Sequence, residues 1–146
     1  MQQTIMELTA AFFGPLGLGV LFHLRGSLLL PAAFGGWMNR MIFLLAAEIT
    51  GGKMVPCLLS SVVTATYAEC LARLLKTPAT ILLVPAIATS APGRMLFYTI
   101  RSMVEGQKEM TRHYGWITAQ YAVAVAMGIS LVWACFMIAG KMREEL

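Results

Sequence analysis

The chain has 146 residues, of which 58% are hydrophobic and only 12% are charged, and its mean hydropathy is +0.72. A soluble domain carries about 25% charged residues, so this composition excludes an ordinary water-exposed surface and predicts an integral membrane protein. The net charge of +4 is scattered rather than gathered in runs, and all seven acidic residues are glutamates, which argues against nucleic-acid binding and against sites built on aspartate.

Five stretches are apolar over about 20 residues, the length that a membrane-spanning helix needs. They cover residues 5–24, 31–50, 54–75, 77–103 and 116–140. A polar stretch, EGQKEMTRHYG, is expected to form a loop between the last two. The sequence therefore predicts an all-α integral membrane protein, with about five transmembrane helices in a single transmembrane domain over residues 1–146. A four-span arrangement stays open if the first or fourth stretch is only half inserted.

The second stretch, PAAFGGWMNRMIFLLAAEIT, carries Asn39 and Arg40 near its midpoint. An arginine stays charged there, and placing it at mid-bilayer costs at least roughly 2.5–3.5 kcal/mol. Glu48 lies about 12 Å further along the same helix, too far for direct contact. The partner of Arg40 must come from another helix, another subunit or an anionic ligand. The alternative is an arginine held by backbone carbonyls at a helix break.

The fourth stretch contains two prolines, Pro85 and Pro92, followed by Gly93. Each proline removes a backbone donor, and freed backbone groups in a bilayer must face protein or a water-lined cavity. We expect a discontinuous helix, broken between Pro85 and Gly93. The alternative is a continuous, kinked packing helix.

A broken helix of this kind supplies the groups that hold a carboxylate. The second half would begin at Gly93 and present its N-terminal amides, while Arg94 adds a bidentate guanidinium. Thr89 and Ser90 offer hydroxyls at the same level. Many secondary transporters build their substrate sites at such breaks. In the kinked-helix alternative, Arg94 snorkels to the membrane interface.

Three glutamates lie within or at the ends of the apolar stretches. Glu7, Glu48 and Glu69 are candidates for proton coupling. Glu7 is near the start of the first stretch and Glu69 near the end of the third. For these two, an interfacial position is the alternative.

The motifs GGWMNRMIFLL and ARLLKTPATILLVPAIATSAPGRMLFYTI together resemble the threonine/serine exporter family, and more narrowly its small membrane half. The resemblance extends from the first stretch to the start of the fifth and rests on the order and spacing of a few positions. These are Gly35, Gly36 and Arg40, then Arg73, Lys76 and Pro78, then Pro85, Pro92 and Gly93.

The resemblance implies export of small carboxylate metabolites across the bacterial inner membrane, driven by an ion or proton gradient. Threonine and serine are the named substrates, and related two-component members are associated with dicarboxylates such as succinate. It also implies a multi-pass chain that works with a larger transmembrane subunit, and it leaves a higher oligomer open. Thr89 stands where the family usually has a proline, and Arg94 is not part of its usual pattern. The extra arginine would fit a second carboxylate.

The leading hypothesis is a transporter subunit with a carboxylate bound between the helix break and Arg40. Asn39, Thr89 and Ser90 would supply its hydrogen bonds. The alternatives are a structural subunit, in which buried charges lock the chain to its partner, and an anion channel. The chain has neither a GxSxG nor an HExxH motif, and its three cysteines are too far apart for a CxxC metal site. We therefore expect no enzyme activity, no metal and no cofactor.

Overall fold

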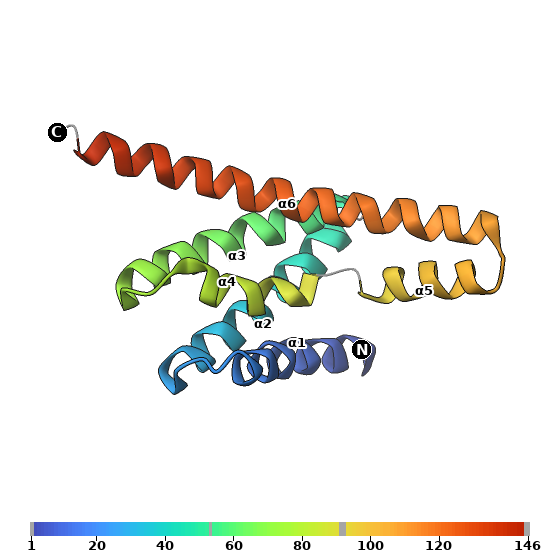
Figure 1. Ribbon diagram of the computed structural model, residues 1–146, viewed down its shortest axis with the longest axis horizontal. Helices are drawn as coiled ribbons and strands as arrows, with labels where there is room; N and C mark the ends of the chain where they lie inside the picture. Colours follow the sequence, from blue (N-terminus) through green and yellow to red (C-terminus); the bar gives the residue numbers. More distant parts are fainter. Residues whose placement is uncertain (1, 53, 91–92, 145–146) are drawn as a thin grey trace.

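The computed structural model describes the backbone of residues 2–52, 54–90 and 93–144, and the side chains from residue 6 to residue 141 within those ranges (Figure 1). The described backbone is helical and contains no strand. The elements are α1 (Gln2–Leu21), α2 (Gly26–Thr50), α3 (Met54–Leu75), α4 (Ala79–Ile87), the 3₁₀ turn η1 (Ala88–Ser90), α5 (Gly93–Val104) and α6 (Lys108–Glu144). The predicted all-α class is confirmed.

Three helices are long and apolar enough to cross a membrane: Gly26–Thr50, Met54–Leu75 and Lys108–Lys141. The pair Ala79–Ser90 and Gly93–Val104 is bent by 57°, and it makes a fourth span if both halves belong to one crossing. The apolar part of α1, Met6–Leu21, is shorter than a typical span. The described helices therefore provide three or four candidate spans, and the expected number of five is not confirmed.

The loop expected between the last two spans is much shorter than predicted. Most of EGQKEMTRHYG is helical, because α6 begins at Lys108. The turn is made by Gly106, whose φ of 73° suits glycine. The amides of Gly106 and Gln107 bond back to Met103 and Ser102, which ends α5 in a Schellman motif. The prediction was wrong because it equated polarity with a loop, although no proline interrupts this stretch.

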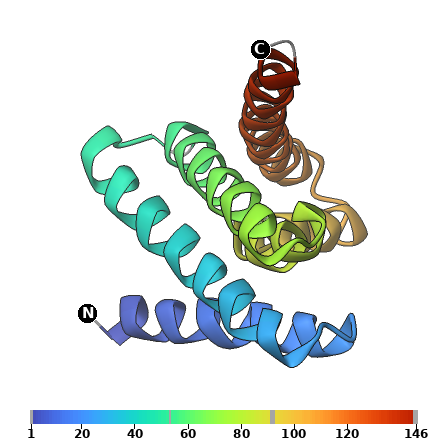
Figure 2. The ribbon, with the colours of Figure 1, turned by 90° about the vertical axis from the view of Figure 1, so that its left-hand side faces the viewer.

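Helices α2 and α3 lie side by side in the middle of the molecule, with α1 across α2 and α6 against α3 (Figure 2). Helix α4 packs against both central helices, whereas α5 packs chiefly on α6. Small residues occupy the crossings, as expected where helices associate without a hydrophobic driving force. A Cβ atom on Gly36 would collide with Pro15 and would lie 3.0 Å from the Ala11 carbonyl oxygen, so α1 and α2 touch through backbone.

Substituting Gly36 should therefore loosen the α1–α2 crossing. We expect Gly36→Ala to lower the free energy of unfolding by about 1–3 kcal/mol through overpacking. Gly17→Ala is the matched control, because a Cβ atom on Gly17 meets nothing within 4 Å, and the change should stabilise the helix by up to about 1 kcal/mol. Thermal unfolding in detergent measures both. A Gly36 variant as stable as the Gly17 variant would contradict the close crossing.

Candidate functional site

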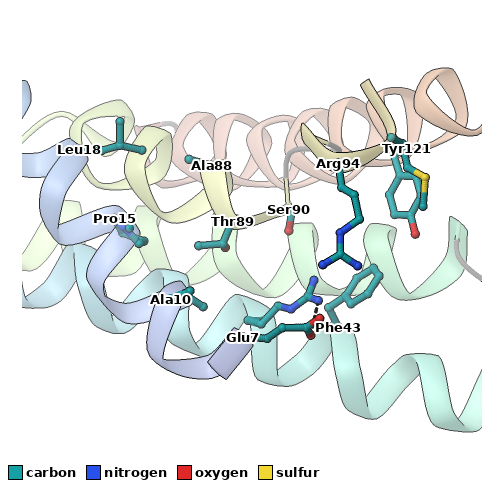
Figure 3. A pocket seen from close by; sticks show the side chains of 14 residues that line it. Glu7, Ala10, Pro15, Leu18, Phe43, Ala88, Thr89, Ser90, Arg94 and Tyr121 are labelled. Carbon is teal, nitrogen blue, oxygen red and sulfur yellow. Dashed lines mark hydrogen bonds and ion pairs between the residues drawn. The ribbon is translucent and has the colours of Figure 1, made fainter. Parts of the chain in front are cut away.

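A cavity of about 450 Å³ lies between α1, α2, the break after α4, and the facing parts of α5 and α6. Its polar lining is supplied by Glu7, Arg40, Thr89, Ser90, Arg94 and Tyr121, and its apolar lining includes Pro15, Leu18, Phe43 and Met95 (Figure 3). Segments that are far apart in the sequence therefore meet around one space. Four of the residues predicted to bind substrate line it: Arg40, Thr89, Ser90 and Arg94.

Arg40 projects from the middle of α2 and forms an ion pair with Glu7 of α1. Its Nη2 atom lies 2.6 Å from Oε2 of Glu7, and the two side chains are 24% and 33% exposed. The guanidinium also lies over the ring of Phe43, with 5.0 Å between Cζ and the ring centroid. The partner that the sequence required for Arg40 thus comes from another helix of the same chain.

Arg94 extends from the first turn of α5 into the same cavity, toward Glu7 and Phe43 (Figure 3). Among the described residues it has no ion-pair or hydrogen-bond partner. The described lining therefore holds two guanidinium groups and one carboxylate, so its net charge is positive. Such a cavity attracts an anion, and a guanidinium can hold a carboxylate through two parallel hydrogen bonds.

Asn39 ties α2 to the interrupted segment instead of lining the cavity. Its side chain is fully buried. Its Nδ2 donates to the carbonyl of Ala86 (3.1 Å) and to Oγ1 of Thr89 (3.2 Å), while its Oδ1 accepts from Ser90 (2.8 Å). Ala86 lies in the last turn of α4, where carbonyls lose their regular helical partners. The amide thus satisfies polar groups that the break would otherwise leave exposed to an apolar surrounding.

The helix break lies in the predicted region. Helix α4 continues past the buried Pro85 to Ile87, the turn η1 follows, and a new helix begins at Gly93. Gly93 itself does not line the cavity, although Arg94 and Met95 next to it do. The predicted contribution of Pro92 lies outside the described residues.

Of the three candidates for proton coupling, Glu7 lines the cavity, whereas Glu48 and Glu69 lie away from it. Glu48 is exposed near the end of α2, and Glu69 lines a separate groove between α3 and α6 with Arg73 and Lys141. Neither forms an ion pair within the described part of the chain. In that part, no three side chains of His, Cys, Asp or Glu gather closely enough to hold a metal ion.

The sequence singled out Glu7 only for proton coupling and did not single out Tyr121 at all, so neither was predicted to line the site. A signal for Glu7 existed, because a mid-membrane arginine needs a carboxylate and few glutamates lie in the apolar stretches. Glu48 shares a helix with Arg40 and is out of reach, which left Glu7 and Glu69 as partners within the chain. No comparable signal singles out Tyr121, whose position depends on how α6 packs against the other helices.

Comparison with known proteins confirms the family that the sequence motifs resemble. The family model described as "Threonine/Serine exporter, ThrE" matches residues 7–135. The matched part begins at Glu7 and includes every described residue that lines the cavity. No curated protein and no solved structure matches the chain.

The hydrogen bonds of Asn39 should stabilise the interrupted segment between α4 and α5. Asn39→Leu keeps a similar volume but leaves the Ser90 hydroxyl without its acceptor. It also removes one of the two donors to the Ala86 carbonyl, which keeps its bond from Thr89, so we expect a loss of about 1–3 kcal/mol. Amide hydrogen exchange should also quicken in Ala88–Ser90. Thr66→Val is the control, since this exposed hydroxyl bonds only to Val62 of its own helix. Equal unfolding temperatures for the two variants would contradict the assignment.

Proposed function

The chain belongs to the threonine/serine exporter family, and on this premise we propose that it is a membrane subunit of a secondary transporter. The proposed substrates are small carboxylate metabolites, either amino acids like threonine and serine or dicarboxylates such as succinate. The proposed location is the cell inner membrane, where the chain works with a larger transmembrane subunit. The family and the several apolar helices already make it a multi-pass membrane protein of exporter type.

The observation that carries this proposal is the guanidinium of Arg94, which has no ion-pair partner in the described part of the chain and lies in the cavity that also holds Arg40. Two like charges directed into one cavity repel each other, and Glu7 forms an ion pair with only one of them. A substrate carboxylate would compensate the second. Ser90 and Thr89 supply hydroxyls on the adjacent wall. A bound substrate could therefore form an ion pair with Arg94 and hydrogen bonds with these hydroxyls.

The arrangement of the helices supports a carrier that works by alternating access. The cavity lies where the α5–α6 pair faces α1 and α2, and α5 is separated from α4 by the break. Because α5 packs chiefly on α6, the two can move together while the break absorbs the change in direction. In the proposed cycle, this motion opens the cavity first to one side of the membrane and then to the other.

The incomplete burial of the helices supports a larger partner. Helix α6 has 37 residues, about 55 Å in length, and its apolar segment is largely exposed in the isolated chain. The short apolar part of α1 would cross the bilayer only beside other helices or by local thinning. We propose that α1 and the bent α4–α5 pair complete a five-span arrangement when the partner is present.

The structural-subunit alternative depended on buried charges that are free to pair with another chain. Arg40 forms its ion pair with Glu7 of the same chain. This argues against Arg40 as the residue that holds two subunits together by a buried ion pair. A channel and a carrier differ in their kinetics, since only the carrier shows flux that saturates and exchanges against substrate.

Arg94→Gln tests the proposal by removing the uncompensated charge. We expect transport of labelled threonine or labelled succinate by proteoliposomes to fall at least about tenfold, because a charge-assisted hydrogen bond to the substrate is lost. Arg101→Gln is the control, as this arginine lies on the same helix, pairs with Glu105 and does not line the cavity. Unchanged transport by the Arg94 variant would refute the proposed site.

A further inference from the structure

We propose that Glu7 determines which carboxylates the cavity accepts. In this assignment, which rests on the proposed function, Glu7 binds the ammonium group of a zwitterionic α-amino acid and repels the second carboxylate of a dicarboxylate. The inference extends the role of Glu7 from a partner of Arg40 to a residue that sets specificity.

The geometry leaves Glu7 able to bind a guest. Its Oε2 atom accepts from Arg40, while Oε1 has no hydrogen-bond partner among the residues that the structure describes. The side chain is one-third exposed and lines the cavity. Among the described lining residues, Glu7 is also the only acidic one. A cationic group in the cavity therefore finds its acceptor at Glu7.

An α-amino acid would complete an alternating row of charges. Arg40 is paired with Glu7, and Arg94 extends toward Glu7 from the other wall (Figure 3). In the proposed binding mode, the ammonium lies at Glu7 and the carboxylate, only one carbon away from it, is directed toward Arg94 in the same lining. Each negative group then lies between two positive ones, and charges of both signs are hydrogen-bonded.

A dicarboxylate cannot be accommodated in this way. Its first carboxylate would pair with Arg94, but its second would meet Arg40 already occupied by Glu7. Three carboxylates would then share two guanidinium groups around one cavity. Like charges placed so close together are unfavourable, so the ionised Glu7 discriminates against the dianion.

Glu7→Gln separates the effects of charge and shape. We compare binding of threonine, 3-hydroxybutyrate and succinate to the purified chain together with any membrane subunit that accompanies it. The second probe is threonine without its ammonium group. The wild-type protein should prefer threonine to both other probes. In Glu7→Gln, threonine should bind about tenfold more weakly or worse, and succinate about tenfold more tightly or better, because Arg40 is freed.

Two further variants keep the test decisive. Glu48→Gln removes a carboxylate that lies outside the cavity on the helix that carries Arg40, and it should leave the order of the three probes unchanged. If Glu7→Gln does not fold because Arg40 loses its partner, the double variant E7Q/R40Q removes both charges of the pair. It keeps the net charge of the cavity and should still lose the preference for threonine over 3-hydroxybutyrate.

The outcomes distinguish this inference from the proposed function. Threonine binding that is unchanged in Glu7→Gln, or in the double variant where the single one does not fold, overturns the role of Glu7 and leaves a carboxylate transporter in place. A wild-type protein that binds none of the three probes overturns the proposed function itself. A wild-type preference for succinate over threonine overturns the inference alone, because the ionised Glu7 would then not exclude a dianion.

Discussion

The ion pair between Arg40 and Glu7 is the interaction on which the site depends. A guanidinium in the middle of an apolar helix stays charged, so the fold must bring a carboxylate to it. Glu7 does this from α1 at 2.6 Å, and the close crossing at Gly36 and Pro15 allows the two helices to approach. The small residues at the crossing therefore allow the ion pair to form one helical turn further along. A bulkier crossing would move Glu7 away from Arg40.

The interruption between α4 and α5 is supported from the same helix. Asn39 stands next to Arg40 in the sequence, and because successive residues of a helix face different directions, the two side chains serve different purposes. Asn39 points to the break and bonds to Ala86, Thr89 and Ser90, whereas Arg40 points into the cavity. The dipeptide thus holds the break in place with one side chain and places a charge beside it with the other.

Much of this organisation could be predicted from local chemistry, because prolines interrupt helices and buried charges need partners. Those rules indicated the break before Gly93 and the importance of Arg40. They could not decide which carboxylate would reach Arg40, because that depends on the crossing of α1 and α2. Asn39 was predicted to contact substrate, yet its hydrogen bonds are used within the protein. The start of α6 at Lys108 was missed because polarity was taken for a loop. The number of spans stayed uncertain because the apolar part of α1 is short and because the α4–α5 pair is bent by 57°.

The charge of the cavity also bears on how a carrier could release what it binds. Two uncompensated guanidinium groups would hold a carboxylate tightly and would be costly to leave empty in a membrane. The internal carboxylate of Glu7 lowers the free energy of the empty cavity, since it keeps Arg40 paired when no guest is present. Arg94, which has no ion-pair partner among the described residues, would then remain to attract the proposed substrate. Transport requires binding that is favourable enough to load the site and weak enough to empty it. In the proposed transporter, the counter-charge of Glu7 would serve both conditions, because it limits the net positive charge of the described lining while Arg94 is left to bind the substrate.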